Sequence, residues 1–246
     1  KLRSRFNRRP TFTEFWNSGA SLDKLRRNHG SWWEFVDQQD DITPDELEVL
    51  EEYGQWFKDL EVTKTSKSYK LVLLDTLLNN NALHVQNDHQ RLAIWSKQWF
   101  LDHPEWISDL PESKQDLSKV ADKEWLQHWR TNPIKFWGTE EKRSNISWFN
   151  NKNKRFVFEQ TITAQNLPTL LSMTREINAL RLAKYQQSNL TGVTSTQPQD
   201  NTIPFFPNIA VACGHFKTGS ANVAEPIVLP RKFNQVSLSK AFIAKA

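Results

Sequence analysis

Apolar residues recur every three or four positions through the first two thirds of the chain, and this spacing predicts helices. The clearest helix start is the run Thr43-Pro44-Asp45-Glu46. Thr43 suits the N-cap, Pro44 the first helical position, and Glu46 completes a capping box. We expect a helix over about 44–60 with acids on its outer face. Its inner positions, at helical spacing, are Leu47, Leu50 or Glu51, Gly54 and Phe57.

Other polar residues stand where helices should begin. The candidate N-caps are Thr11 or Thr13, Ser21 (with a stop at Gly30), Ser31, Ser66 or Ser68, and Asn87 or Asp88 (with a stop before Pro104). A further helix is expected over 115–130, and Pro168 opens a long one. The segment 69–78 is apolar nearly all round, so we predict that it is a buried central helix.

Two aromatic alternating runs surround NNKNK in residues 146–159 and predict a β-hairpin. Residues 187–202 are polar and aperiodic, which is typical of a linker. Short β-type pieces follow. The fold class expected is therefore mainly α: a multi-helix domain with a small hairpin over 1–186, a linker over 187–202, and the start of a small β-rich domain over 203–246.

Composition restricts the cellular location that we expect for the protein. No apolar run approaches the ~20 residues of a membrane span, and no signal peptide is visible. The only cysteine, Cys213, excludes an internal disulfide and favours a reducing, cytoplasmic location. The chain begins without methionine and ends within an alternating apolar pattern, so we expect it to be a segment of a longer polypeptide.

The formal net charge of +4 is small, but charge is unevenly distributed. Residues 1–30 carry eight Lys or Arg against two acids, and residues 31–61 carry eleven acids against Lys58. These blocks either pair internally or present two faces. The local excess permits contact with a DNA backbone through Arg3, Arg5, Arg8, Arg9, Lys24, Arg26 and Arg27.

Two further basic groups are candidates for binding phosphate. The predicted hairpin tip carries Lys152, Lys154 and Arg155, which either touch a phosphate backbone or keep the tip soluble. Lys64, Lys67 and Lys70 stand at the start of the helix near residue 69, where unpaired N–H groups favour anions. The alternative for this second group is an ordinary solvated helix start.

Recognisable catalytic and nucleotide-binding patterns are missing. The six histidines show no HxxxH or HExxH spacing, so we predict no metal site. There is no GxxxxGK[ST] loop and no GxGxxG loop. We therefore expect no cofactor and no complete active site in this segment.

The last 44 residues carry a resemblance of their own. Ala212-Cys213-Gly214 resembles the cleavage site of LexA/UmuD-type (S24 peptidase-like) domains, EPIVLPRKFNQ resembles the linking strand, and AFIAKA the strand before the nucleophile. The resemblance implies a scissile bond between Cys213 and Gly214. It also implies that the catalytic Ser and Lys lie beyond Ala246.

The helical part resembles the region after the motor in bacterial DEAD/DEAH-type superfamily II helicases of restriction or phage-defence character. The stretches that carry this resemblance are RRPTFTEFW, HGSWWEFV, TKTSKSYKLVLLDTLL, NPIKFW and EINALRLAKY. It implies that ATP and Mg belong to motor domains of the same polypeptide. The implied partners are duplex DNA, contacted on its backbone, those motor domains, and other defence-system proteins.

Three functions follow as hypotheses. The first is a DNA-contacting, regulatory accessory region of an ATP-dependent DNA helicase, with an S24-like tail. The second is a LexA/UmuD-type autoproteolytic switch with a helical sensor domain. The third is a non-catalytic helical module for protein–protein interaction.

Overall fold

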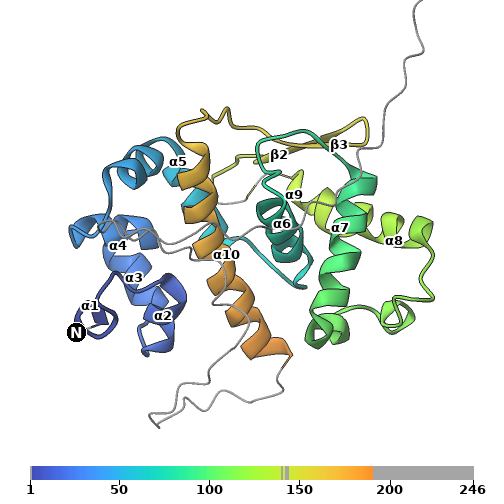
Figure 1. The fold of residues 1–246 in the computed structure, drawn as a ribbon, viewed down its shortest axis with the longest axis horizontal. Coiled ribbons are helices and arrows are strands. Elements are labelled where there is room, and N and C mark those ends of the chain that lie inside the picture. Colours follow the sequence, from blue (N-terminus) through green and yellow to red (C-terminus); the bar gives the residue numbers. More distant parts are fainter. Residues whose placement is uncertain (1, 140, 142–143, 191–246) are drawn as a thin grey trace, which may run out of the picture. The chain divides into compact units, whose positions relative to one another are not determined.

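The computed structural model describes residues 2–139, 141 and 144–190. The chain divides into two units, and all of these residues belong to the first, Lys1–Gln197. This part is mainly helical, as expected, with one small sheet (Figure 1). Its helices are α1 (Leu2–Phe6), α2 (Phe12–Asn17), α3 (Leu22–His29), α4 (Trp32–Gln38), α5 (Pro44–Val62), α6 (Tyr69–Asn79), α7 (His89–Asp102), α8 (Asp122–Trp129), α9 (Lys135–Trp137) and α10 (Leu167–Asn189).

Polar side-chain caps fix the starts of five of the ten described helices. The Thr43 hydroxyl accepts from the Glu46 amide at 3.3 Å, and a Glu46 carboxylate oxygen accepts from the Thr43 amide at 2.9 Å, so the predicted capping box is confirmed. The other confirmed caps are Thr11 for α2, Ser21 for α3, Ser31 for α4 and Asp88 for α7. Gly30 ends α3 with a φ of 89°, a conformation that favours glycine.

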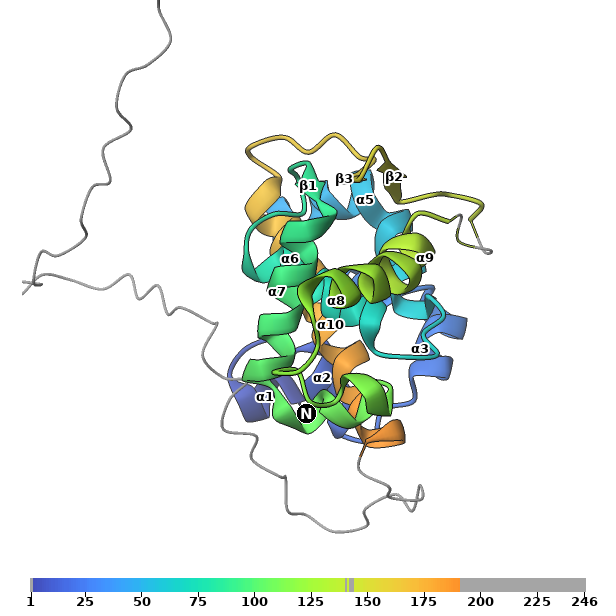
Figure 2. The same ribbon diagram turned by 90° about the vertical axis from the view of Figure 1, so that its right-hand side faces the viewer.

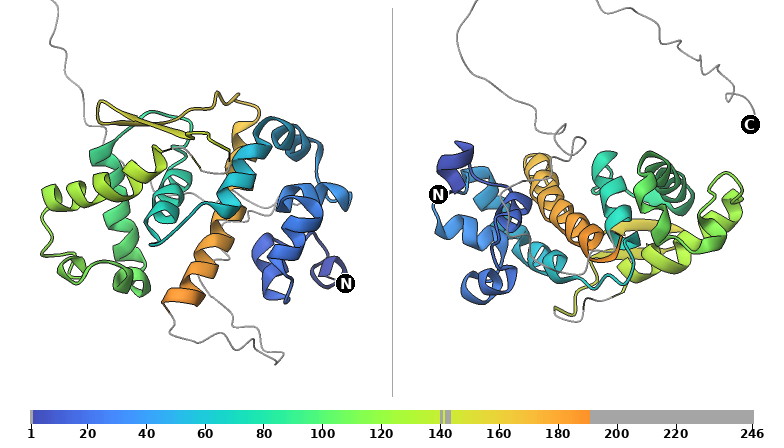
Figure 3. Two further views of the ribbon diagram at one scale, coloured as in Figure 1. Left: turned by 180° about the vertical axis from the view of Figure 1, so that it is seen from behind. Right: turned by 90° about the horizontal axis from the view of Figure 1, so that it is seen from below.

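The long helix α10 runs through the middle of the described unit. It packs against α5, α6 and α2, and Figure 3 shows the N-terminal helices on one side of it and α6 to α9 on the other. The predicted buried helix is α6, and its leucines from Leu71 to Leu78 are buried. Helix α7 packs between α6 and α8 (Figure 2). These contacts make α6 and α10 the core of the fold.

The hairpin belongs to a three-stranded antiparallel sheet. Its strands are β2 (Phe149–Lys152) and β3 (Arg155–Phe158), and β3 pairs on its other edge with the two-residue strand β1 (Asn87–Asp88). The predicted hairpin is confirmed, whereas β1 has no signal in the sequence because two polar residues carry no periodicity.

Two helix predictions need correction. Of the predicted inner positions of α5, Phe57 is buried, but Leu47 is 36% exposed and Leu50 and Gly54 are only partly buried. The buried face is set instead by Val49, Tyr53, Trp56 and Leu60 with Phe57, and it also takes in the acids Asp59 and Glu61. The large aromatic rings bury more apolar area than Leu47 does, and they set the rotation of the helix. The helix expected over 115–130 begins only at Asp122, after 3₁₀ helices at Pro104–Asp109 and Glu112–Lys114.

The tryptophans are mostly core residues. Trp16 and Trp95 are partly buried, and the other nine of the eleven are buried. A buried indole N–H usually finds an acceptor, although those of Trp33 and Trp129 have none among the described residues. Trp56 donates to the Thr174 hydroxyl at 3.1 Å, and Trp148 donates to Asp59 at 3.0 Å. Among the described residues, no helix is long and apolar enough to cross a membrane.

Candidate nucleic-acid interface

The β2–β3 hairpin presents three of the predicted DNA-binding residues at its tip. Lys152 and Arg155 are register partners, and Asn153 and Lys154 form the two-residue connection with φ values of 52° and 60°. Positive φ at both positions suits the type I′ turn, whose twist matches the flanking strands. The side chains of Lys152, Lys154 and Arg155 are all exposed.

Aromatic packing anchors this tip to the domain. Phe149 stacks on Phe156 with ring centroids 4.6 Å apart, and Phe158 lies 5.1 Å from the ring of Trp56 on α5. A Cβ added at Gly138, just after α9, would come within 2.9 Å of the Asn151 Cβ. The hairpin is therefore fixed against both α5 and α9, and its charges have defined positions.

Acidic side chains do not neutralise the hairpin tip. In the part of the chain that the structure describes, no carboxylate lies at ion-pair distance from Lys152, Lys154 or Arg155. Asp88 is the register partner of Arg155, but its carboxylate pairs with Arg91 at 3.9 Å. The Arg91 backbone N–H also holds the pKa of Asp88 below its usual value.

The N-terminal basic block is different, because much of it is paired internally. Arg8 forms a bidentate pair with Glu14 at 2.6 and 2.8 Å, and Arg26 pairs with Asp23 at 2.7 Å. Arg3 pairs with Asp41 in the acidic block. The remaining candidates of this block, Arg5, Lys24 and Arg27, have exposed side chains.

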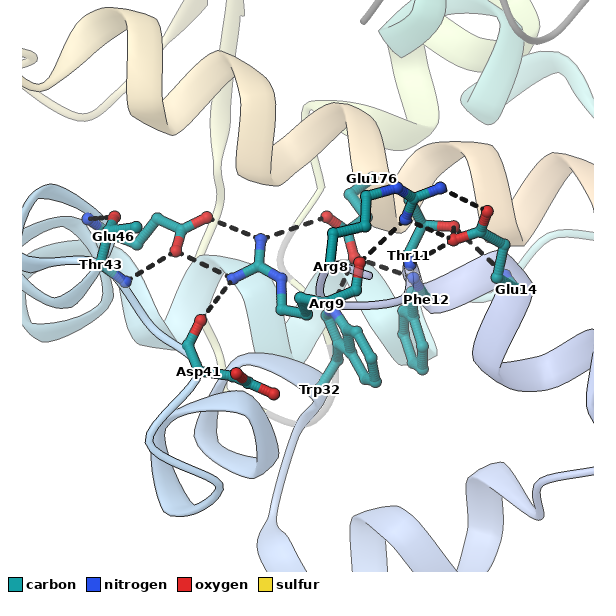
Figure 4. A network of polar contacts seen from close by, with 10 residues as sticks. All are labelled: Arg8, Arg9, Thr11, Phe12, Glu14, Trp32, Asp41, Thr43, Glu46 and Glu176. Carbon is teal, nitrogen blue, oxygen red and sulfur yellow. Dashed lines mark hydrogen bonds and ion pairs between the residues drawn. The ribbon is translucent and has the colours of Figure 1, made fainter. Parts of the chain in front are cut away.

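Arg9 lies at the centre of a network that joins three segments (Figure 4). Its guanidinium donates to the two carboxylate oxygens of Glu46 at 2.7 and 2.9 Å and lies 3.8 Å from Glu176. It also covers the ring of Trp33 at 4.8 Å. Burial acts to lower the pKa of Arg9, but the hydrogen bond to Glu46 and the charge of Glu176 outweigh it and raise that pKa. Arg9 thus has a structural role.

Glu176 holds the N-terminal helices against α10. One of its oxygens accepts from the Phe12 amide at 2.8 Å and from the Trp32 indole N–H at 2.8 Å (Figure 4). Burial raises the pKa of Glu176 to about 7. Glu61 on α5 is similar: it accepts from the Trp32 amide at 2.7 Å, and burial raises its pKa to about 7.

The lysines at the start of α6 do not form the phosphate site that their spacing predicts. The buried carboxylate of Asp109 accepts from the Ser68 amide at 2.8 Å and from the Ser68 hydroxyl at 2.6 Å, and it pairs with Lys67 at 3.1 Å. Lys70 pairs with Glu141 at 2.8 Å. The protein therefore supplies its own anion at this helix end, and Lys64 is exposed with no ion pair to any residue that the structure describes.

Two basic residues that the sequence did not single out lie near Arg26. Arg181 and Lys184 are on the last turns of α10, and the charges of Arg26 and Arg181 both act to lower the pKa of Lys184, after burial itself. In the sequence these two residues look like the solvated face of a long helix. Only the tertiary structure brings them close enough for their charges to act on one another.

The predicted scissile bond, Cys213–Gly214, lies outside the described residues, as does the whole segment 203–246. The predicted linker begins inside a helix, since α10 extends to Asn189. Within the described ranges, no group of three His, Cys, Asp or Glu side chains is placed to hold a metal ion.

Comparison with known proteins adds no assignment. No protein-family model matches the chain, and neither a curated protein nor a solved structure resembles it closely enough to count as a match.

Proposed function

We propose that the helical domain contacts the sugar–phosphate backbone of duplex DNA through the tip of the β2–β3 hairpin. The observation that carries this proposal is the set of three exposed cations, Lys152, Lys154 and Arg155, on a hairpin whose backbone is anchored to the domain. Among the described residues, none of the three has a carboxylate at ion-pair distance. Contacts of this kind to phosphates are sequence-independent and weaken as salt rises.

Within a longer polypeptide, this domain would act as an accessory region of an ATP-dependent DNA helicase of phage-defence or restriction type. That context comes from the sequence resemblance alone. The exposed cations of the hairpin support the DNA-contacting part of this role. ATP and Mg would then belong to motor domains outside these residues, and the S24-like tail would regulate or recruit.

The test is the salt dependence of duplex DNA binding by the 246-residue chain, measured by fluorescence anisotropy. The double variant Lys152→Gln/Lys154→Asn removes two charges, and Asn tolerates the positive φ at position 154. We expect the slope of log affinity against log salt to fall in magnitude by about 1.8, since each lost phosphate contact contributes about 0.9.

The matched control is Lys119→Gln/Lys123→Gln, which removes two exposed charges in and just before α8. This control should leave the slope unchanged. An equal loss of slope in both double variants would mean that net charge, and not the hairpin, drives binding. Absence of binding by the wild-type chain at low salt would end the proposal.

A protein-interaction module remains the second candidate, and one observation favours it. On α7, Ile94 is 58% exposed and Leu101 is 52% exposed, so one helix face carries uncovered apolar side chains. If the wild-type chain does not bind DNA, this face becomes the leading functional surface. The autoproteolytic switch stays a prediction from the resemblance at Cys213 and Gly214.

A further inference from the structure

The C-terminal end of α10 carries a cluster of cations that is distinct from the hairpin. The charge of Arg26 on α3 acts to lower the pKa values of both Arg181 and Lys184 on α10. Helix α10 has 23 residues and so is roughly 34 Å long. Figure 1 shows the sheet near its first turns and the cation cluster's end pointing away from the sheet.

Carboxylates do not balance this cluster. Arg181 donates to the backbone carbonyls of Glu61 and Thr63, and to the Thr65 hydroxyl at 3.2 Å, all of which are neutral acceptors. Lys184 has no carboxylate at ion-pair distance among the described residues. Burial and then the charge of Arg26 lower the pKa of Arg181 to about 10.

The nearby acids do not fill this role. The Glu61 carboxyl is 4% exposed and directed at the Trp32 amide, and burial raises its pKa to about 7, so it is largely neutral below that pH. Asp23 is 83% exposed and pairs with Arg26, and its charge also acts to raise the pKa of Lys184. The charge of Glu141 acts to raise the pKa of Arg181, but Glu141 pairs with Lys70 at 2.8 Å. The cluster of Arg26, Arg181 and Lys184 therefore keeps a net positive charge that an added anion would offset.

A polar hollow of about 270 Å³ opens beside these cations. Its lining residues are Thr65, Arg181, Lys184, Tyr185, Ser188 and Asn189, and none of them is acidic. The Thr65 hydroxyl accepts from Arg181, so its own hydrogen is available for donation outward. The Ser188 hydroxyl and the Lys184 ammonium add further donors.

We propose that this hollow binds a phosphate group, with the Lys184 ammonium and the Thr65 and Ser188 hydroxyls as its donors and Arg181 as the fixed charge beneath it. Hydroxyl and ammonium donors around a pre-formed positive charge are the groups that phosphate oxygens require. The phosphate belongs either to a nucleic-acid backbone or to a phosphorylated small molecule. No residue of the hairpin takes part in this site.

The experiment titrates the full 246-residue chain with inorganic phosphate against chloride at equal ionic strength, and follows phosphate affinity by the rise in melting temperature. The variant Lys184→Met keeps the apolar stem and removes the charge. We expect it to weaken phosphate binding about tenfold or more, the effect of losing one charge-assisted hydrogen bond. Lys123→Met, at an exposed position of α8, should bind phosphate like the wild type. Equal phosphate affinity in Lys184→Met and wild type would overturn the proposal.

A second measurement needs no variant. Phosphate should protect Lys184, but not Lys123, from an amine-reactive reagent read by mass spectrometry, and lack of protection at Lys184 would overturn the proposal. A duplex oligonucleotide then identifies the source. If the duplex also protects Lys184, the phosphate is that of a DNA backbone; if only inorganic phosphate protects it, the ligand is a small phosphorylated molecule. If phosphate still protects Lys184 in the Lys152→Gln/Lys154→Asn variant, the site is independent of the hairpin.

Discussion

Two basic regions of this protein differ in where their counter-charges lie. The N-terminal block is richer in Arg than the hairpin, yet Arg3, Arg8 and Arg9 pair with carboxylates of the domain itself. The shorter hairpin carries Lys152 and Lys154 at a tip that no described acid reaches. The density of positive charge in a sequence is therefore a weak guide to DNA contact. A better guide is the distance, in the folded protein, between each cation and the nearest acid.

Removing the Arg9 charge should give the largest effect. Arg9→Met leaves Glu46 and Glu176 without their shared cation in a mostly buried place, so we expect the free energy of unfolding to drop by about 3–5 kcal/mol. Urea denaturation measures it, with exposed Arg5→Met as the control, expected within about 0.5 kcal/mol of wild type. The folded fraction should still bind DNA normally. A weakened DNA affinity with unchanged stability would reverse the roles assigned to the two regions.

The pH dependence of stability sharpens the same contrast, because the N-terminal helices pack on two buried acids, Glu61 of α5 and Glu176 of α10, whereas the hairpin strands contain no acid. Burial raises the pKa values of Glu61 and Glu176 from 4.5 to about 7. Between these two pH values the native state binds more protons than the unfolded state. The free energy of unfolding should therefore fall as pH rises from about 4.5 to about 7, by about 3 kcal/mol for each group.

Glu176→Gln should remove the part of this decrease in unfolding free energy that Glu176 contributes. The amide oxygen of Gln still accepts from Phe12 and Trp32, but the side chain no longer titrates. Glu46→Gln serves as the control in a different pH window. Burial opposes the shift of Glu46, but the hydrogen bond from Arg9 outweighs it and lowers its pKa, so Glu46 contributes stability that is lost below about 4.5. A flat profile above pH 4.5 in wild type would contradict the raised pKa values.

The smallest expected effect is at the hairpin turn. Lys154→Gly places glycine at a φ of 60°, where a side chain is unfavourable, so stability should stay constant or rise by up to about 1 kcal/mol. The same change should lower the salt slope of DNA binding by about 0.9. Thermal unfolding measures the stability, and fluorescence anisotropy measures the salt slope of DNA binding, both on the same protein preparation. A clear loss of stability would show that Lys154 has a packing role.

Local signals in the sequence predicted the local structure well. The capping residues Thr43, Ser21 and Asp88 were recognisable because each cap is made by residues three apart. The hairpin was recognisable from the alternation of aromatic residues around a polar turn. These features need no knowledge of the rest of the fold.

Long-range features were not predictable. The bond from Ser68 to Asp109 spans 41 residues, and that from Phe12 to Glu176 spans 164. Nothing at Asp109 or Glu176 distinguishes them from solvated acids in the sequence. The same applies to Lys184, whose proximity to Arg26 depends on how α3 packs. Charge pairing of this kind depends on the tertiary structure. The structure therefore corrected the predicted site residues more than it corrected the predicted fold.

The position of Trp32 has a consequence for the order in which the chain folds. Its amide is held by Glu61 and its indole by Glu176, at separations of 29 and 144 residues. Helices α1 to α4 have eight residues or fewer, below the ~12–15 that an isolated helix needs for stability in water. These short helices must therefore gain their stability by docking.

A ribosome releases Trp32 long before Glu176 exists to receive it. During synthesis the contacts of Phe12 and Trp32 with Glu176 form only once α10 has emerged, and loop closure over such a separation is slow. A truncation within α10 that removes Glu176 would therefore release these contacts of the N-terminal helices.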